Sequence, residues 1–196
     1  MQALGHRLVA GIDEAGRGPL AGPVTAAAVI LPEGFHHEGV DDSKKLSESR
    51  REQVYEDLLA DEGVLWAWAQ VEAGEIDRIN ILRATHLAMA RAVEGLGVKP
   101  DVALVDGRRV EGLPVPHRGV VKGDTLSLSI AAASIIAKVE RDRIMRKYAA
   151  EFPQYGFEKH KGYGTKEHLE GLKRYGPCAI HRKSFAPVAE AAGEVQ

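Results

Sequence analysis

The chain has 196 residues, of which 44% are hydrophobic and 28% are charged. This balance is typical of a folded globular protein and is too apolar for a disordered one. The single cysteine, Cys178, excludes an internal disulfide and any zinc site that needs several thiolates. No apolar run reaches the roughly 20 residues of a membrane span, and residues 1–8 lack a secretory or transit pattern. We therefore expect a cytoplasmic protein without a membrane contact.

The net charge of −2 is unevenly distributed along the chain. Residues 138–183 carry 12 Lys and Arg against 6 Asp and Glu, a net of +6, so the remainder carries −8. A basic quarter beside an acidic remainder is typical of a protein that binds a polyanion on one face. A solvated helix with mixed charges would give the same count, so charge alone leaves both interpretations open.

Apolar periodicity and turn residues predict an alternation of strands and helices. In chain order the predicted elements are a strand at 7–13, a Gly- and Pro-rich connection at 16–23, a strand at 24–31, a loop at 35–45, a helix at about 47–60, a strand at 64–71, a helix at about 75–96, strands at 102–106 and 119–121, a helix at about 124–149, a loop at 152–163, a helix at 166–175 and a frayed tail at 188–196. This order favours an α/β fold with a mixed, partly antiparallel sheet flanked by helices, and a small helical C-terminal extension.

Four acidic residues stand where apolar segments end: Asp13 and Glu14, Asp106, and Asp124 ahead of the alanine-rich helix. Strand ends are where open α/β sheets place active sites. Clustered carboxylates repel one another unless cations bind, and Mg²⁺ or Mn²⁺ suits such oxygen ligands. Local sequence nevertheless favours Asp124 as a helix N-cap and allows Asp106 as a turn residue. Because side chains alternate along a strand, Asp13 and Glu14 face one site only if the strand breaks there.

Glycines and basic residues form a second group of candidates. Gly16, Arg17 and Gly18 follow the acidic pair, and backbone without side chains lets a hydroxyl or phosphate approach closely. Lys44 and Lys45 offer ammonium groups to phosphates, although an exposed loop would have the same composition.

Tyr163 stands between two glycines in the segment HKGYGT at 160–165. A tyrosine in such a basic, glycine-rich segment suits stacking on a base or a sugar. A tyrosine that packs on the core is the commoner alternative.

Several short stretches carry a family pattern: GIDEAGRGPLAGPV at 11–24, DSKKLS at 42–47, VDG at 105–107, VKGD at 121–124, AASIIAKVERD at 132–142, FPQYGF at 152–157, HKGYGT at 160–165 and HRKSF at 181–185. In this order they resemble bacterial ribonuclease HII, over about residues 9–188. The run D-E-x-G-R-G, followed by A-A-S-I-x-A-K-V and H-K-G-Y, is highly specific.

The resemblance implies an RNase H-like catalytic domain at 1–150 and an extension at 151–196 that completes the substrate groove. It implies an endonuclease that cuts the RNA strand of RNA–DNA hybrids and incises 5′ of a single ribonucleotide in duplex DNA. By motif matching, the four acids named above take the catalytic and metal-binding positions. The 16–18 backbone and Tyr163 take those that sense the ribose 2′-hydroxyl and the RNA–DNA junction.

With that family's chemistry, two divalent ions, Mn²⁺ or Mg²⁺, would flank the scissile phosphate and leave 3′-hydroxyl and 5′-phosphate ends. Lys44, Lys45, Ser134 and Lys138 are the predicted phosphate contacts. A monomer is expected, and the sequence does not reveal whether a sliding clamp binds.

Other functions remain open at this point. Another two-metal nuclease of the same fold, such as an exonuclease or a Holliday-junction resolvase, would use the same acids, and a substrate with an internal ribonucleotide and no free ends distinguishes them. A catalytically silent hybrid-binding protein should have lost one of the four acids, which are all present. A metal-dependent phosphatase would not explain Tyr163 or the basic quarter.

Overall fold

The computed structural model of the chain describes residues 7–41 and 46–193. A five-stranded sheet with the strand order β3-β2-β1-β4-β5 forms its centre. The strands are β1 (Val9–Ala15), β2 (Val24–Ile30), β3 (Leu65–Val71), β4 (Val102–Asp106) and β5 (His117–Val120). Strand β2 is antiparallel to β1 and β3, whereas β4 is parallel to β1 and β5. The mixed sheet that the sequence predicts is confirmed.

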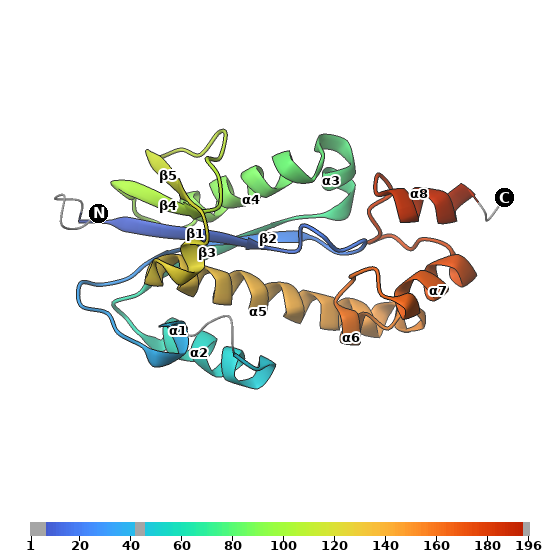
Figure 1. Cartoon of the computed structure of the whole chain (residues 1–196), viewed down its shortest axis with the longest axis horizontal. Helices are drawn as coiled ribbons and strands as arrows, with labels where there is room; N and C mark the ends of the chain where they lie inside the picture. Colours follow the sequence, from blue (N-terminus) through green and yellow to red (C-terminus); the bar gives the residue numbers. More distant parts are fainter. Residues whose placement is uncertain (1–6, 42–45, 194–196) are drawn as a thin grey trace.

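Helices cover both faces of this sheet (Figure 1). They are α1 (Glu38–Asp41), α2 (Glu48–Ala60), α3 (Ala73–Ile79), α4 (Ile81–Glu94), α5 (Leu128–Glu151), α6 (Phe157–His160), α7 (Lys166–Tyr175) and α8 (Ala186–Gly193), with 3₁₀ turns η3 (Gly123–Thr125) and η4 (Pro153–Tyr155). Helix α4 packs on one face and α5 on the other, and α1 and α2 lie on the outer side of α5. In the described part of the chain, no helix is long and apolar enough to span a bilayer.

Small side chains let the two covering helices approach the sheet closely. Every residue of β2 is buried, and its three consecutive alanines, Ala26, Ala27 and Ala28, face α4 and α5 in turn. On β1, a Cβ at Gly11 would lie only 2.1 Å from the backbone carbon of Ser129 at the start of α5. The long helix therefore rests directly on the strand that carries Asp13.

The last quarter of the chain packs at one end of the molecule, beyond the sheet (Figure 1). Tyr155 and Phe157 join Met145 of α5 in one apolar cluster. Val188 of α8 is fully buried against Leu20 in another. The tail expected to be frayed from residue 188 is therefore a packed helix as far as residue 193. Helix α5 ends at the predicted boundary between 1–150 and 151–196, and the division into two parts remains a prediction.

Several predicted elements have different bounds in the structure. The helix expected at 75–96 is two helices, because Asn80 adopts a φ of 68° and its side chain accepts a hydrogen bond from the N–H of Arg83 at 3.1 Å, which caps α4. The long helix begins at Leu128 rather than near 124, after the turn η3. The segments expected to be loops contain α1, η4 and α6.

Candidate active site

Two carboxylates come together because β1 and β4 run parallel and in register. Ile12 pairs with Val105, and both belong to the apolar cluster on the α4 face of the sheet. Side chains alternate along a strand, so the next residues, Asp13 and Asp106, turn towards the opposite face, which α5 covers. Ser134 of α5 accordingly lies close enough to Asp13 to act against the rise in its pKa.

Asp13 is a buried carboxylate with negative neighbours. Only 7% of its surface is exposed, and its Oδ1 accepts a hydrogen bond from the N–H of Glu14 at 2.7 Å. Burial and the charge of Glu14, with a smaller contribution from Asp106, raise the pKa of Asp13 well above its usual value. A positive partner is therefore needed to keep Asp13 ionised without a large energetic cost.

Glu14 lies on the other face of the sheet, because β1 continues through Ala15 without a break. Its strand partner is Ala26, which packs on the α4 side. Its Oε1 accepts a hydrogen bond from Nη1 of Arg17 at 3.1 Å. Burial raises the pKa of Glu14, although the bond from Arg17 and its charge act in the opposite direction.

The carboxylates suit a divalent cation in their chemistry, but they do not form a ready ligand cage. Within residues 7–41 and 46–193, no group of three or more His, Cys, Asp or Glu side chains is arranged to hold a metal ion. Alternation separates Asp13 from Glu14, and Oδ1 of Asp106 accepts the N–H of Gly123 at 2.6 Å. Asp13, Glu14 and Asp106 all offer oxygen donors, are at least partly buried and repel one another. A hard divalent ion binds such oxygens and neutralises the repulsion.

Asp124 lies next to this group along the chain, in the turn η3. It follows Gly123, whose N–H donates to Asp106, but it lines a separate hollow of about 160 Å³ near the start of α5. The N-cap of α5 is Ser127, so the interpretation of Asp124 as a helix cap is wrong. The charges of Glu14 and Asp106 thus reach Asp13, and that of Asp106 reaches Glu14, although Asp13 and Glu14 lie on opposite faces of the strand.

A cavity of about 390 Å³ lies beside the acids. Its lining includes the predicted catalytic acid Glu14 and most of the predicted substrate contacts: Gly16, Arg17, Gly18, Ser134, Lys138 and Tyr163. A Cβ at Gly18 would lie 3.6 Å from Cε1 of Tyr163, so the tyrosine ring stands against this loop. The Tyr163 side chain is 47% exposed and does not pack in the core.

The predicted phosphate contacts differ in their surroundings. Ser134 lies near Asp13 and lowers its pKa. Nζ of Lys138 forms an ion pair with Oδ1 of Asp142 at 2.6 Å, and both Ser134 and Lys138 line the cavity. Lys44 and Lys45 lie outside the described residues.

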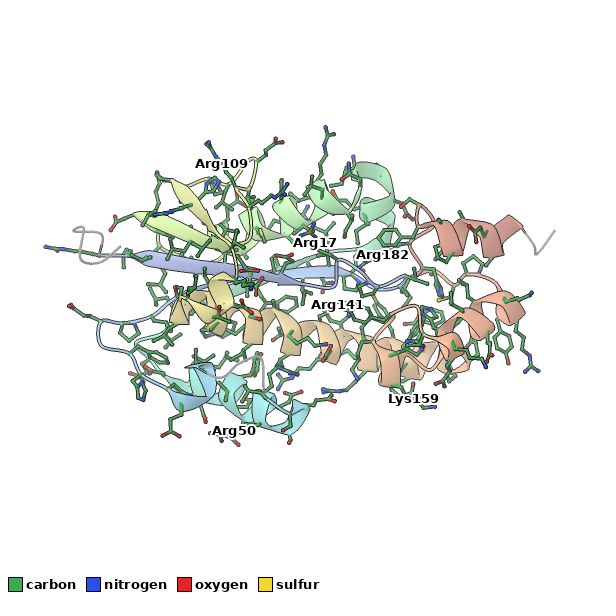
Figure 2. All side chains as sticks on the ribbon, viewed as in Figure 1. Arg17, Arg50, Arg109, Arg141, Lys159 and Arg182 are labelled. Carbon is green, nitrogen blue, oxygen red and sulfur yellow. The ribbon has the colours of Figure 1, made fainter. Side chains whose placement is uncertain are left out.

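Sequence reasoning missed three arginines at this site. Arg51 of α2 and Arg141 of α5 line the same cavity, and Arg182 donates hydrogen bonds to the loop that follows β1. Figure 2 shows Arg17, Arg141 and Arg182 near the end of β1, whereas Arg109 lies farther away, in the connection between β4 and β5. Arg141 and Arg182 belong to the motifs AKVERD and HRKSF, but a motif does not reveal that an arginine is buried.

A second cavity, of about 490 Å³, continues the site towards β4. Glu14 and Arg17 line both cavities, and Asp106, Arg108 and Arg109 line only the second. The carboxylates therefore lie between two hollows whose rims carry several basic side chains. A chain of phosphates is the kind of ligand that fits this arrangement of charge.

Solved structures share this architecture. Ribonuclease H2 from Pyrococcus horikoshii OT3 matches with a TM-score of 0.79 and 28% identity, over 95% of this chain and 97% of that one. RNase HII from Archaeoglobus fulgidus, solved in a complex with PCNA, matches with a TM-score of 0.72 and 30% identity, over 86% and 88% of the two chains. The fold and the site therefore define a nuclease of the ribonuclease H type.

Sequence comparison narrows this class to one family. The family model for ribonuclease HII matches residues 10–188. Ribonuclease HII from Syntrophus aciditrophicus (strain SB) is 57% identical over 181 residues, which cover 92% of this chain and 85% of that relative. The chain belongs to the ribonuclease HII family and is an endoribonuclease that acts on RNA–DNA hybrids.

Proposed function

We propose that this enzyme incises duplex DNA on the 5′ side of a single embedded ribonucleotide and hydrolyses the phosphodiester with the help of two divalent ions. The observation that carries the proposal is the shared cavity. It places Glu14 beside the side-chain-free backbone at 16–18 and beside the exposed ring of Tyr163. The residues that would recognise one sugar therefore lie next to a carboxylate suited to phosphate hydrolysis.

Asp13, Glu14 and Asp106 are the residues that would hold Mg²⁺ or Mn²⁺, and Asp124 is the fourth candidate. Bound ions would activate a water molecule and stabilise the departing 3′-oxygen, which leaves 3′-hydroxyl and 5′-phosphate ends. The carboxylates contribute charge and orientation. Glu14 is held by Arg17, and Asp106 by the N–H of Gly123, so both start from defined positions.

The 2′-hydroxyl is the chemical difference between a ribonucleotide and its deoxyribose neighbours. The 16–18 backbone can approach that hydroxyl closely, because no Cβ stands on Gly18 at the side of Tyr163. Tyr163 would stack on the sugar of the following nucleotide. Ser134 and Lys138, on the same cavity, would contact phosphates.

We propose that the functional unit is a monomer, in which the two cavities beside the acids form one substrate groove. The sliding clamp PCNA is present in the structure of the archaeal relative. A sliding clamp is therefore a candidate partner of this chain. A binding measurement with a purified bacterial clamp tests this.

The decisive experiment uses a covalently closed duplex DNA that contains one ribonucleotide and has no free ends. With Mg²⁺ or Mn²⁺ we expect a single nick 5′ of the ribonucleotide, with a 3′-hydroxyl that a polymerase extends. An all-DNA circle and a reaction with chelator should remain intact. Cleavage of RNA–DNA hybrids without a nick in this circle would contradict the proposal, and so would a nick that survives chelation.

A further inference from the structure

Two buried arginines hold the loop that follows β1 by its carbonyl oxygens. Arg182 donates to the carbonyls of Gly16 at 2.5 Å, Arg17 at 3.0 Å and Gly22 at 2.9 Å. Arg141 donates to the carbonyls of Ala21 at 3.1 Å and Pro23 at 3.0 Å. Five of the eight carbonyl groups between residues 16 and 23 thus accept from these two side chains.

Neither guanidinium group has an acidic partner at salt-bridge distance in the part of the chain that the structure describes. Arg141 is 1% exposed and Arg182 is fully buried. Burial lowers the pKa of Arg141 to about 10 and that of Arg182 to about 9, so both remain charged at neutral pH. Nη1 of Arg141 is buried without a hydrogen-bond partner among the described residues. Two buried cations with no salt-bridge partner among the described residues are costly, so their placement beneath this loop calls for a functional explanation.

The position of the carbonyls determines where the adjacent N–H groups point. In a trans peptide the C=O of one residue and the N–H of the next point in opposite directions, and the chain has no cis peptide among the described residues. Because Arg182 draws the carbonyls of Gly16 and Arg17 inwards, the N–H groups of Arg17 and Gly18 point away from it. No described residue accepts a hydrogen bond from either N–H.

Further contacts of the loop also hold its backbone in this orientation. Gly16 adopts a φ of +95°, and a Cβ there would lie 2.0 Å from Nε of Arg141. The arginine thus occupies the space that a side chain at residue 16 would need. Further along, the N–H of Leu20 donates to the carbonyl of Gly162 at 2.8 Å, which ties this loop to the segment that carries Tyr163.

We propose that Arg182, with Arg141, is a positioning residue for substrate specificity: it turns the N–H groups of Arg17 and Gly18 into the cavity, where they hydrogen-bond to the ribose of the ribonucleotide. Arg182 itself does not touch the substrate. The inference rests on the proposed function, because it concerns how the same site recognises a ribonucleotide.

The test measures binding in chelator, where no cleavage occurs, to two otherwise identical duplexes, one with a single ribonucleotide and one all-DNA. We expect the wild-type enzyme to prefer the ribonucleotide duplex. Arg182→Lys keeps the positive charge but loses the planar guanidinium group that donates to three carbonyls. We expect the ratio of its affinities for the ribonucleotide duplex and the all-DNA duplex to fall about tenfold, as for one lost hydrogen bond. Its affinity for the all-DNA duplex should be unchanged.

Arg146→Met is the matched control, because it removes an arginine from α5 that contacts Glu48 and Glu52 instead of the loop. It should keep the full preference. An equal loss of affinity for both duplexes in Arg182→Lys would indicate a merely structural role and overturn the inference. So would an undiminished preference in that variant.

A second measurement needs no variant. In the ¹⁵N-labelled wild-type enzyme with chelator, the amide signals of Arg17 and Gly18 should shift with the ribonucleotide duplex and not with the all-DNA duplex. Equal shifts would overturn the inference even if Arg182→Lys did not fold. A wild-type enzyme that nicks 5′ of the ribonucleotide but binds both duplexes equally also overturns it, and leaves the proposed function intact. An enzyme that does neither removes the proposed function itself.

Discussion

At the scale of single residues, Asp13 is the clearest example of a side chain that we expect to serve activity while it lowers the stability of the fold. Its carboxylate is buried beside Glu14 and near Asp106, so neutralising it removes a repulsion that folding must overcome. We expect Asp13→Asn to abolish cleavage of an RNA–DNA hybrid, and its thermal midpoint to equal or exceed that of the wild type. Gel-based cleavage and calorimetry measure both.

Asp106→Asn provides a matched comparison, because the amide oxygen can still accept the N–H of Gly123. It should lose cleavage and keep hybrid binding, as measured by fluorescence anisotropy in chelator. Wild-type rates in either variant would exclude these acids from the reaction.

Tyr163 is the second residue whose side chain we expect to matter for activity alone. Its backbone makes the structural bonds: its N–H donates to the carbonyl of His160 at 2.9 Å, and its carbonyl accepts from His168, also at 2.9 Å. Tyr163→Ala should therefore preserve the thermal midpoint and reduce cleavage at a single ribonucleotide at least tenfold, since stacking is worth about 1–3 kcal/mol.

Tyr163→Phe keeps the ring and serves as the control for stacking. It should stay within a few-fold of the wild type on the same substrate. A large fall in the thermal midpoint of Tyr163→Ala would instead assign the ring to packing.

Residue types and spacing were sufficient to select the acids, the 16–18 backbone and Tyr163 as candidates, because each interrupts its local pattern in a visible way. They were insufficient for Arg141 and Arg182. Buried and exposed arginines look alike in a sequence, and these two meet the loop across more than 110 residues. That Asp124 belongs to η3 and does not cap α5 was equally unreadable, since the turn sets where the helix begins.

At the scale of elements, the contact between β1 and α5 depends on one missing side chain. A Cβ at Gly11 would meet backbone atoms of Ser129 and Ile130 at 2.1–2.4 Å, and rigid backbone cannot yield as a flexible side chain would. We expect Gly11→Ala to lower the free energy of unfolding by about 2 kcal/mol or more. Urea denaturation followed by circular dichroism measures the loss.

Gly74 in α3 is the matched control, because no atom lies within 4 Å of a Cβ built there. Gly74→Ala should be neutral or stabilise the protein by up to about 1 kcal/mol, as alanine favours a helix. Equal stability of the two variants would contradict the close approach of β1 and α5.

Periodicity located most of the strands and long helices, because one buried face repeats every two or every three to four residues. Periodicity failed where the conformation or burial of a single residue determines the helix. Asn80 divides one apolar repeat into α3 and α4 through its own backbone conformation. Helix α8 was missed because alanines and one valine carry little periodic signal, although Val188 is completely buried.

A chain of histidines makes the C-terminal segment sensitive to acid. The N–H of Cys178 donates to Nδ1 of His181 at 3.0 Å, and Nε2 of His181 lies 3.0 Å from Nε2 of His168. Burial, followed by the charge of His168, lowers the pKa of His181 to about 4, against about 6.5 in the unfolded chain. The unfolded state therefore binds more protons between these pH values.

Stability from His181 should accordingly be complete above pH 6.5 and decline as the pH falls towards 4, by up to about 3 kcal/mol. Denaturant unfolding at a series of pH values measures this slope. His181→Gln retains an acceptor and a donor without titrating, so its slope should be shallower. Equal slopes for both proteins would show that other groups cause the acid sensitivity.

At the scale of the whole molecule, distant parts of the chain meet around one groove. The acids come from β1 and β4, the basic side chains from α2, α5 and the β4–β5 connection, and Tyr163 from the C-terminal quarter. This convergence favours the polyanion-binding interpretation over the alternative that composition left open. Part of the basic quarter is a structural network, in which Arg143 and Arg146 pair with acids of α2, while Lys138 and Arg141 line the groove.

Binding of a hybrid should therefore depend steeply on salt, because each phosphate contact releases counterions. Arg51 lines the groove, whereas its neighbour Arg50 is exposed at the outer side of α2 (Figure 2). We expect Arg51→Ala to reduce the slope of log affinity against log salt by about 1 and Arg50→Ala to leave it unchanged. Anisotropy titrations in chelator at several salt concentrations give these slopes. A flat dependence for the wild-type enzyme, or equal slopes for Arg51→Ala and the wild type, would show that the groove does not take phosphates at this point. The polyanion would then have to follow another face of the molecule.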